Sequence, residues 1–222
     1  MQSTVWHCRM MSDYQIGNKP GLAVKWFGQD WDPPTHIPPI RPMKNVDQLF
    51  RYMRGESLPR QTFPEAVYVF DGKRFGKMKE LFAAGGFYMV NSNLARVLAQ
   101  FDLGQGELVP LPFYQEDKVT RLPEDFYLWT FAAQKNAVLP EQSRNIKPFG
   151  IGVNIVEGLW SVRPDVEDDD IALSASVAAR PPDVWCDTKL DASLFFSGAL
   201  VAALRAAKIK TNFHLCRCRL TS

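Results

Sequence analysis

The sequence predicts an α+β fold, in which helices flank a mixed or antiparallel β-sheet. Two observations indicate this class: β-prone apolar runs recur along the chain, and a strand followed by a capped helix occurs twice. Apolar residues make up 46% of the 222 residues and charged residues 23%, which is a globular composition. We expect one main domain over residues 45–222, preceded by an arm over residues 1–44.

The N-terminal arm is expected to be irregular and to lie on the surface. Prolines lack an amide donor and stop a helix, so a proline-rich stretch favours extended backbone. Trp26 and Trp31 come just before this stretch, and we expect them to pack the arm against the main domain. The prolines are Pro33, Pro34, Pro38, Pro39 and Pro42.

Local patterns predict the next elements. Apolar residues three and four apart over residues 46–53 predict a short amphipathic helix that ends near Gly55. A tight turn is expected at Asp71-Gly72, so the basic stretch 73–79 is interpreted as a solvated hairpin turn. Strands are expected at residues 63–70, 126–131 and 149–162, and a weak helical patch at residues 77–82.

A strand–helix–strand unit occurs twice. A shift of 106 residues superposes Asn91 on Ser197, and both side chains suit a helix N-cap because their oxygens accept the first free amide hydrogens. An apolar run precedes each cap, and apolar residues at helical spacing follow it. Both units then continue into β-like stretches, at residues 106–111 and 211–216. We interpret this pattern as a twofold unit.

The motifs of common enzymes are missing from the sequence. The Gly-x-Gly pairs at residues 104–106 and 150–152 do not continue as a dinucleotide-binding motif. Zinc sites favour cysteines two to four residues apart, which the spacing of Cys216 and Cys218 does not match. We therefore interpret this segment as a half-buried strand and expect neither an enzyme nor a cofactor. The alternative is a metal- or thiol-dependent hydrolase that uses His214, Cys216 and Cys218.

Charge and hydropathy limit which classes of partner the protein is expected to bind and in which cell compartment it is expected to lie. The formal net charge is +2, which argues against a dedicated nucleic-acid binder. A nucleic-acid adaptor would use Lys73, Arg74, Lys77 and Lys79. No apolar run approaches the roughly 18 residues of a membrane span, and the first nine residues do not resemble a secretion signal. These features predict a cytoplasmic protein with reduced thiols.

Two surface features are candidates for binding a partner. An acidic cluster either forms a solvated loop or meets a basic partner surface, where charge steers the encounter. The tryptophans of the arm are candidate anchors, because Trp is enriched at interface hot spots. The candidate residues are Asp165, Glu167, Asp168, Asp169, Asp170, Trp26 and Trp31.

The C-terminal segment resembles a known family. Residues 184–209 contain a tryptophan at Trp185, a polar stretch, a Phe-Phe-Ser cap at 195–197 and a helix that runs to Ile209. This pattern is similar to the end of the immunity protein eleven family of bacterial polymorphic toxin systems. Residues 87–98, 106–111 and 127–139 resemble its earlier blocks, so the resemblance covers about residues 45–220. It implies a protein that binds a co-encoded toxin by stoichiometric occlusion, and it implies no catalytic residues.

Overall fold

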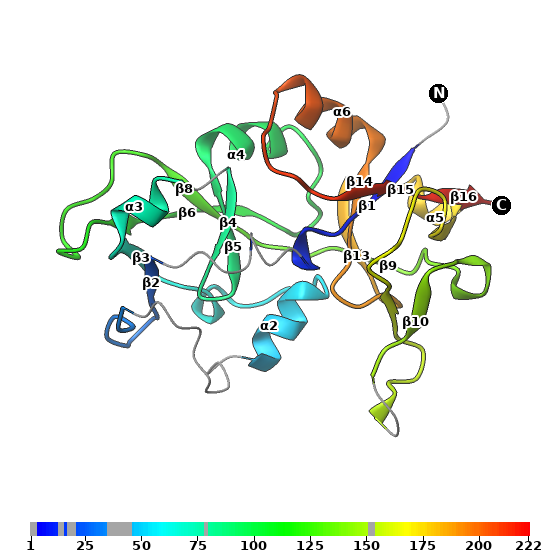
Figure 1. Ribbon diagram of the computed structural model, residues 1–222, viewed down its shortest axis with the longest axis horizontal. Helices are drawn as coiled ribbons and strands as arrows, with labels where there is room; N and C mark the ends of the chain where they lie inside the picture. Colours follow the sequence, from blue (N-terminus) through cyan, green and yellow to red (C-terminus); the bar gives the residue numbers. More distant parts are fainter. Residues whose placement is uncertain (1–3, 13–15, 17–20, 35–45, 78–79, 151–153) are drawn as a thin grey trace.

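The computed structural model describes residues 4–12, 16, 21–34, 46–77, 80–150 and 154–222. In Figure 1, a four-stranded and a three-stranded sheet occupy the left half of the molecule, and a five-stranded sheet occupies the right half. The five-stranded sheet has the order β15-β1-β14-β13-β9. Its strands are β1 (Val5–Cys8), β9 (Gln134–Lys135), β13 (Val184–Asp187), β14 (Leu194–Ser197) and β15 (Leu215–Arg217).

The remaining sheets are smaller. The four-stranded sheet has the order β4-β5-β8-β6, with β4 (Leu81–Ala84), β5 (Phe87–Asn91), β6 (Leu108–Leu111) and β8 (Phe126–Trp129). The three-stranded sheet has the order β2-β3-β7, with β2 (Leu22–Lys25), β3 (Ala66–Val69) and β7 (Phe113–Tyr114). Two further pairs join β10 (Ile146–Pro148) to β11 (Trp160–Val162), and β12 (Ala172–Ser174) to β16 (Arg219–Thr221).

Short helices connect and cover these sheets. The α-helices are α2 (Val46–Met53), α3 (Gly72–Phe75), α4 (Ser92–Leu98), α5 (Ala175–Ala178) and α6 (Gly198–Ala206). Single 3₁₀ turns occur at Met10–Ser12, Arg60–Thr62 and Pro140–Gln142. The α+β class and the mixture of parallel and antiparallel pairing agree with the sequence prediction. Among the helices of the described segments, none is long and apolar enough to cross a bilayer.

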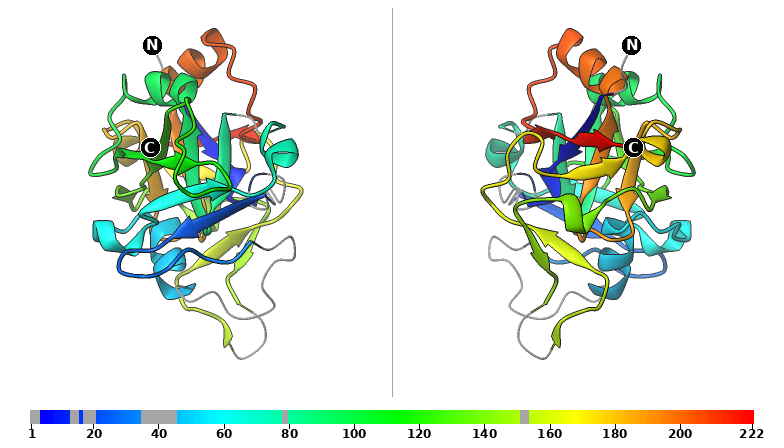
Figure 2. Two further views of the ribbon diagram at one scale, coloured as in Figure 1. Left: turned by 90° about the vertical axis from the view of Figure 1, so that its left-hand side faces the viewer. Right: turned by 90° about the vertical axis from the view of Figure 1, so that its right-hand side faces the viewer.

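The expected twofold unit is present, and it extends beyond the repeated sequence. The strand order β4-β5-β8-β6 matches β13-β14-β1-β15, and neighbouring strands are antiparallel throughout both sets. The Asn91 side chain accepts the Leu94 amide at 3.0 Å, and the Ser197 side chain accepts the Leu200 amide at 3.2 Å. The two capped helices, α4 and α6, lie side by side above the sheets (Figure 1 and Figure 2).

The five-stranded sheet separates two hydrophobic clusters. Successive strand residues point to opposite faces, so Phe195 and Phe196 enter different clusters. The larger cluster continues into the left half of the molecule and includes Trp129 and Leu128. The smaller cluster lies on the opposite face of the five-stranded sheet and includes Trp185. Burial on both faces explains why the strand at residues 194–196 is a continuous apolar run.

The irregular structure expected for the first 44 residues is wrong for two segments. The strand β1 lies between β14 and β15, where Val5 pairs with Ser197 and His7 pairs with Cys216. The strand β2 pairs antiparallel with β3. Residues 1–44 therefore contribute strands to two sheets of the main domain. The expected proline-rich segment lies mostly outside the described residues.

Other local expectations are also corrected. Asp71 does not form a hairpin turn: its side chain accepts the Arg74 amide at 3.1 Å and caps α3. Residues 81–84 are a strand rather than a helix, because they pair with β5 across the turn at Gly85-Gly86. Within the predicted strand 149–162, the described residues form a strand only at 160–162, and residues 151–153 lie outside the described residues. The helix at 46–53 and the strands within 63–70 and 126–131 are confirmed.

Candidate functional site

The three-stranded sheet has an unusual outer face. Its inner face packs Val24, Val67 and Phe113 into the larger cluster. On the opposite face, Tyr68 pairs with Tyr114 across β3 and β7. An outward face of a small sheet is ordinarily polar, since water covers it. Here aromatic rings occupy it instead.

Trp31 lies against both tyrosines. Its ring meets Tyr68 edge-on with centroids 5.2 Å apart, and it meets Tyr114 edge-on at 5.8 Å. The segment that carries Trp31 runs beside β2. Trp31 forms a β-bridge with Lys25, and the backbone amide of Asp32 donates to the Val24 carbonyl at 2.9 Å. The rings of Trp31 and Tyr114 remain half-buried. We call Trp31, Tyr68 and Tyr114 the aromatic face.

Two cations cover the aromatic face. The Lys118 ammonium lies 4.7 Å from the centre of the Tyr68 ring, and the Arg121 guanidinium lies 5.9 Å from the centre of the Tyr114 ring. Both belong to a hairpin in which Tyr114 and Arg121 form a β-bridge. Burial raises the pKa of Tyr68, and the nearby carboxylates of Asp32 and Glu116 raise this pKa further.

The tip of this hairpin is built by Asp117. Its Oδ1 accepts the amides of Val119 and Thr120 at 3.0 and 2.8 Å, and its Oδ2 accepts the Thr120 hydroxyl at 2.5 Å. These bonds lower the pKa of Asp117. They hold Lys118 at a positive φ of 61°, which directs its side chain back toward Tyr68. Val119 is left 78% exposed at the tip.

The two tryptophans expected to act together have different roles. Trp26 turns inward: its Nε1 donates to Asp32 Oδ2 at 2.9 Å, and its ring meets the buried Phe87 edge-on at 6.2 Å. Between the two tryptophans, Phe27 is 37% exposed beneath the Arg60 guanidinium, 4.8 Å from its ring centre. Both tryptophans are half-buried, but Trp26 packs against the larger cluster whereas Trp31 lies on the outer face, so Trp31 is the better candidate anchor.

The acidic cluster is mostly engaged within the molecule. Asp168 Oδ1 accepts the Arg217 amide at 2.7 Å, and the Asp169 amide donates to the Arg217 carbonyl at 2.7 Å. The Asp169 carboxylate also pairs with the Arg217 side chain, which lowers the pKa of Asp169. Because β15 is an outer strand of its sheet, these contacts cover its open edge.

The other acidic residues divide into one buried and two exposed side chains. Asp170 is buried, its carboxylate accepts a hydrogen bond from the side-chain Nδ2 of Asn145 at 2.7 Å, and it pairs with Arg144 at 3.1 Å. Asp165 and Glu167 are exposed. The loop contacts β15 at the right of Figure 1, whereas the aromatic face lies on β3 and β7 at the left. The candidate residues therefore form two distant sites.

The thiols offer little nucleophilic chemistry. All four cysteines are free, and burial raises the pKa of Cys8, Cys186, Cys216 and Cys218. A protonated thiol is a poor nucleophile and a poor metal ligand. His214 is exposed, while Cys218 is buried. Within the described residues, no three His, Cys, Asp or Glu side chains are placed to hold a metal ion. The hydrolase alternative stays a prediction that no observation favours.

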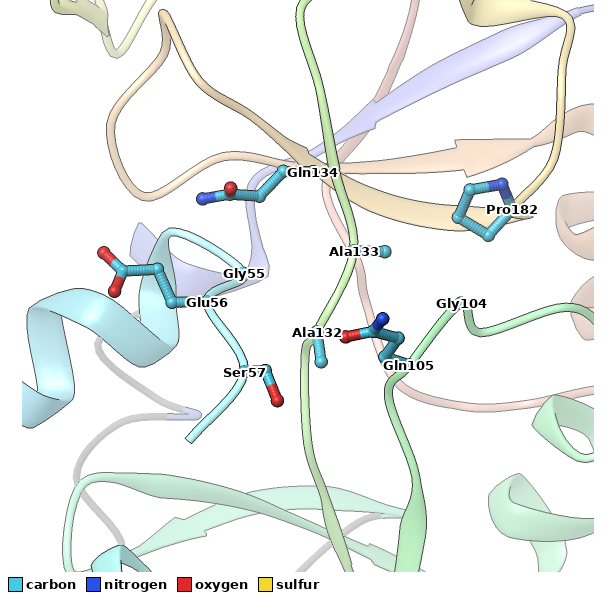
Figure 3. A pocket seen from close by; sticks show the side chains of 9 residues that line it. All are labelled: Gly55, Glu56, Ser57, Gly104, Gln105, Ala132, Ala133, Gln134 and Pro182. Atoms are coloured by element: carbon cyan, nitrogen blue, oxygen red, sulfur yellow. The ribbon is translucent and has the colours of Figure 1, made fainter. Parts of the chain in front are cut away.

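A surface hollow of about 560 Å³ lies beside β9 (Figure 3). Main chain, small side chains and uncharged polar groups form most of its lining, with Glu56 at one side. Gly104 is part of this lining, and close packing requires a glycine there, since an added Cβ would lie 2.7 Å from the Ala133 Cβ. The Gly-x-Gly pair at residues 104–106 thus lets the chain turn close to Ala133. The lining is Gly55, Glu56, Ser57, Gly104, Gln105, Ala132, Ala133, Gln134 and Pro182.

The sequence matches no protein-family model and no curated protein. The resemblance to the immunity protein eleven family therefore stays a prediction. Sequence reasoning found Trp31 but missed Tyr68, Tyr114, Lys118 and Arg121. All residues of the run 66–70 are apolar or aromatic, so nothing in the run distinguishes its outer face from its inner face.

Proposed function

We propose that this chain is a cytoplasmic immunity protein that binds a cognate toxin and blocks it by stoichiometric occlusion. The observation that carries the proposal is the aromatic face, where Trp31 and Tyr114 are half-buried beside Lys118, Arg121 and the exposed Val119. Trp, Tyr and Arg are the residues enriched at interface hot spots. The sequence resemblance over residues 45–220 supports the same function.

Occlusion requires a surface of ordinary interface size. A stable complex buries about 800 Å² on each partner, and a few central residues supply most of the affinity. The aromatic face would supply that centre, and the charged side chains around it would form the rim. The toxin's active site, or a surface that it needs, would be covered without any chemical step.

The test is binding and rescue with the toxin domain encoded beside this chain. We expect co-expression to restore growth and calorimetry to give a one-to-one complex. Trp31→Ala should weaken the complex by at least about tenfold, the effect of roughly 1.4 kcal/mol. The control is Trp6→Ala, because Trp6 is also half-buried beneath a cation, Arg205, at 4.9 Å, but lies on another sheet. No rescue and no complex at micromolar concentration would overturn the proposal.

A further inference from the structure

The cations of the aromatic face are held by rings rather than by carboxylates. Lys118 lies over Tyr68 and Arg121 lies over Tyr114. Among the described residues, neither cation forms an ion pair of the kind that joins Arg217 to Asp169 or Arg144 to Asp170. This difference matters for recognition, because an existing ion pair must be exchanged before a partner can use the cation.

A ring orders a cation without using its donors. An ammonium has three N–H donors and a guanidinium five, and a cation–π contact uses the charge rather than these hydrogens. The rings also restrict the side-chain rotamers, which lowers the entropy lost on binding. Lys118 has a second restriction, since Asp117 fixes the turn that carries it. Both cations are therefore positioned in advance with donors available.

We propose that the aromatic face binds a carboxylate-bearing patch on a folded partner protein, with Lys118 and Arg121 as the contacting cations. This inference rests on the proposed function and names the chemistry of the toxin surface. Each cation donates to a partner carboxylate, while Val119 and the edge of Trp31 contact an apolar side chain beside it. Arg121 suits a bidentate contact because its guanidinium is planar.

The charges around the face favour a folded protein over a nucleic acid. The hairpin from residue 114 to residue 121 contains Lys118 and Arg121 but also Glu116 and Asp117, so its formal charge is zero. On the neighbouring turn, Asp30 is exposed and Asp32 is half-buried. A continuous phosphate backbone would meet these carboxylates, and its affinity depends on a consistently basic track. Separate carboxylates on a folded surface can avoid them.

The test compares charge reversal at two sites of the same kind. The double variant Lys118→Glu/Arg121→Glu removes both cations from the aromatic face. The control is Arg205→Glu, which reverses an exposed cation that lies over Trp6 on another sheet. Association with the neighbouring toxin domain is measured by stopped-flow at two salt concentrations, and circular dichroism checks that both variants fold.

We expect the double variant to lower the association rate at least about tenfold and to remove or invert the fall of this rate with salt, since attraction between opposite charges is replaced by repulsion. Arg205→Glu should bind like the wild type. If the wild type forms a complex and the double variant associates with the toxin domain at the same rate, this inference is overturned and the proposed function stays intact. Absence of any wild-type complex would overturn both. Binding of a single-stranded oligonucleotide that the double variant abolishes would also overturn the inference.

Discussion

His7 and Leu128 occupy equivalent positions in the two repeated units. His7 pairs with Phe195 in β14, Leu128 pairs with Met89 in β5, and the shift of 106 residues that relates the caps also relates Met89 to Phe195. Both positions are buried, with 1% and 0% exposure. Among the described residues, neither ring nitrogen of His7 has a hydrogen-bond partner. The second unit therefore places an imidazole where the first places an aliphatic side chain.

Replacing His7 by leucine should stabilise the protein. Burial, with a smaller contribution from Arg9, lowers the pKa of His7 from 6.5 to about 3. Between these values the unfolded chain binds a proton that the native chain does not, so stability rises with pH across this window. We expect the wild type to lose about 2 kcal/mol from pH 7 to pH 5 through this group alone.

The His7→Leu variant should lack this loss and should gain about 1 kcal/mol at pH 7, because two unpaired polar atoms are removed. Urea unfolding at pH 5 and pH 7 measures both effects. Leu128→His is the matched control, and it should introduce the acid sensitivity into the first unit. Equal pH dependence in the wild type and His7→Leu would show that the native imidazole is not desolvated.

Removing either helix cap should cost about 1 kcal/mol, with a range of 0.5–2. Asn91→Ala and Ser197→Ala each leave an amide near the helix start without its acceptor. Asn93→Ala is the control, since Asn93 is exposed inside α4 and alanine is the better helix former. Thermal unfolding of the three variants gives the comparison, and a cap variant as stable as Asn93→Ala would contradict the assignment.

The two helix caps could be predicted from the sequence, whereas the strand pairing in the five-stranded sheet could not. A cap and the apolar residues after it lie within one short stretch, so sequence spacing alone reveals them. The strand β1 fills the position in the second unit that β8 fills in the first, and it pairs with strands almost the whole chain away. A pattern within one short stretch of sequence does not predict pairing between strands so far apart in the chain. The same limit applies to the aromatic face, because its residues come from three separate segments.

The acidic loop should protect an open sheet edge. Asp168→Ala removes the acceptor of the Arg217 amide, which leaves a donor of β15 open to another chain. We expect this variant to associate more strongly with rising concentration, as measured by sedimentation velocity. Asp165→Ala is the control, because Asp165 is exposed in the same loop. If both variants sediment like the wild type at all concentrations, the loop does not guard the edge.

Lys135 should be required for stability although it is charged and buried. Its ammonium donates to the carbonyls of Ala178, Arg180 and Pro182, and it lies 3.6 Å from the centre of the Trp185 ring. Lys135→Met keeps the aliphatic volume but leaves these carbonyls unpaired, which should cost about 1–3 kcal/mol near pH 7.

The titration of Lys135 gives a second readout. Burial lowers the pKa of Lys135 from 10.5 to about 8. Between these values the unfolded chain holds a proton that the native chain releases, so this group makes stability rise as pH increases from about 8 to 10.5. The buried cysteines act in the opposite sense over this range, because burial raises the pKa of each thiol and only the unfolded chain loses these protons. In urea unfolding at pH 8 and pH 10, Lys135→Met should therefore lose more stability with rising pH than Lys147→Met, which removes an exposed lysine and keeps the contribution of Lys135. Equal pH dependence in Lys135→Met and Lys147→Met would show that Lys135 does not contribute to it, and an unchanged stability at pH 7 would show that water replaces the ammonium at the three carbonyls.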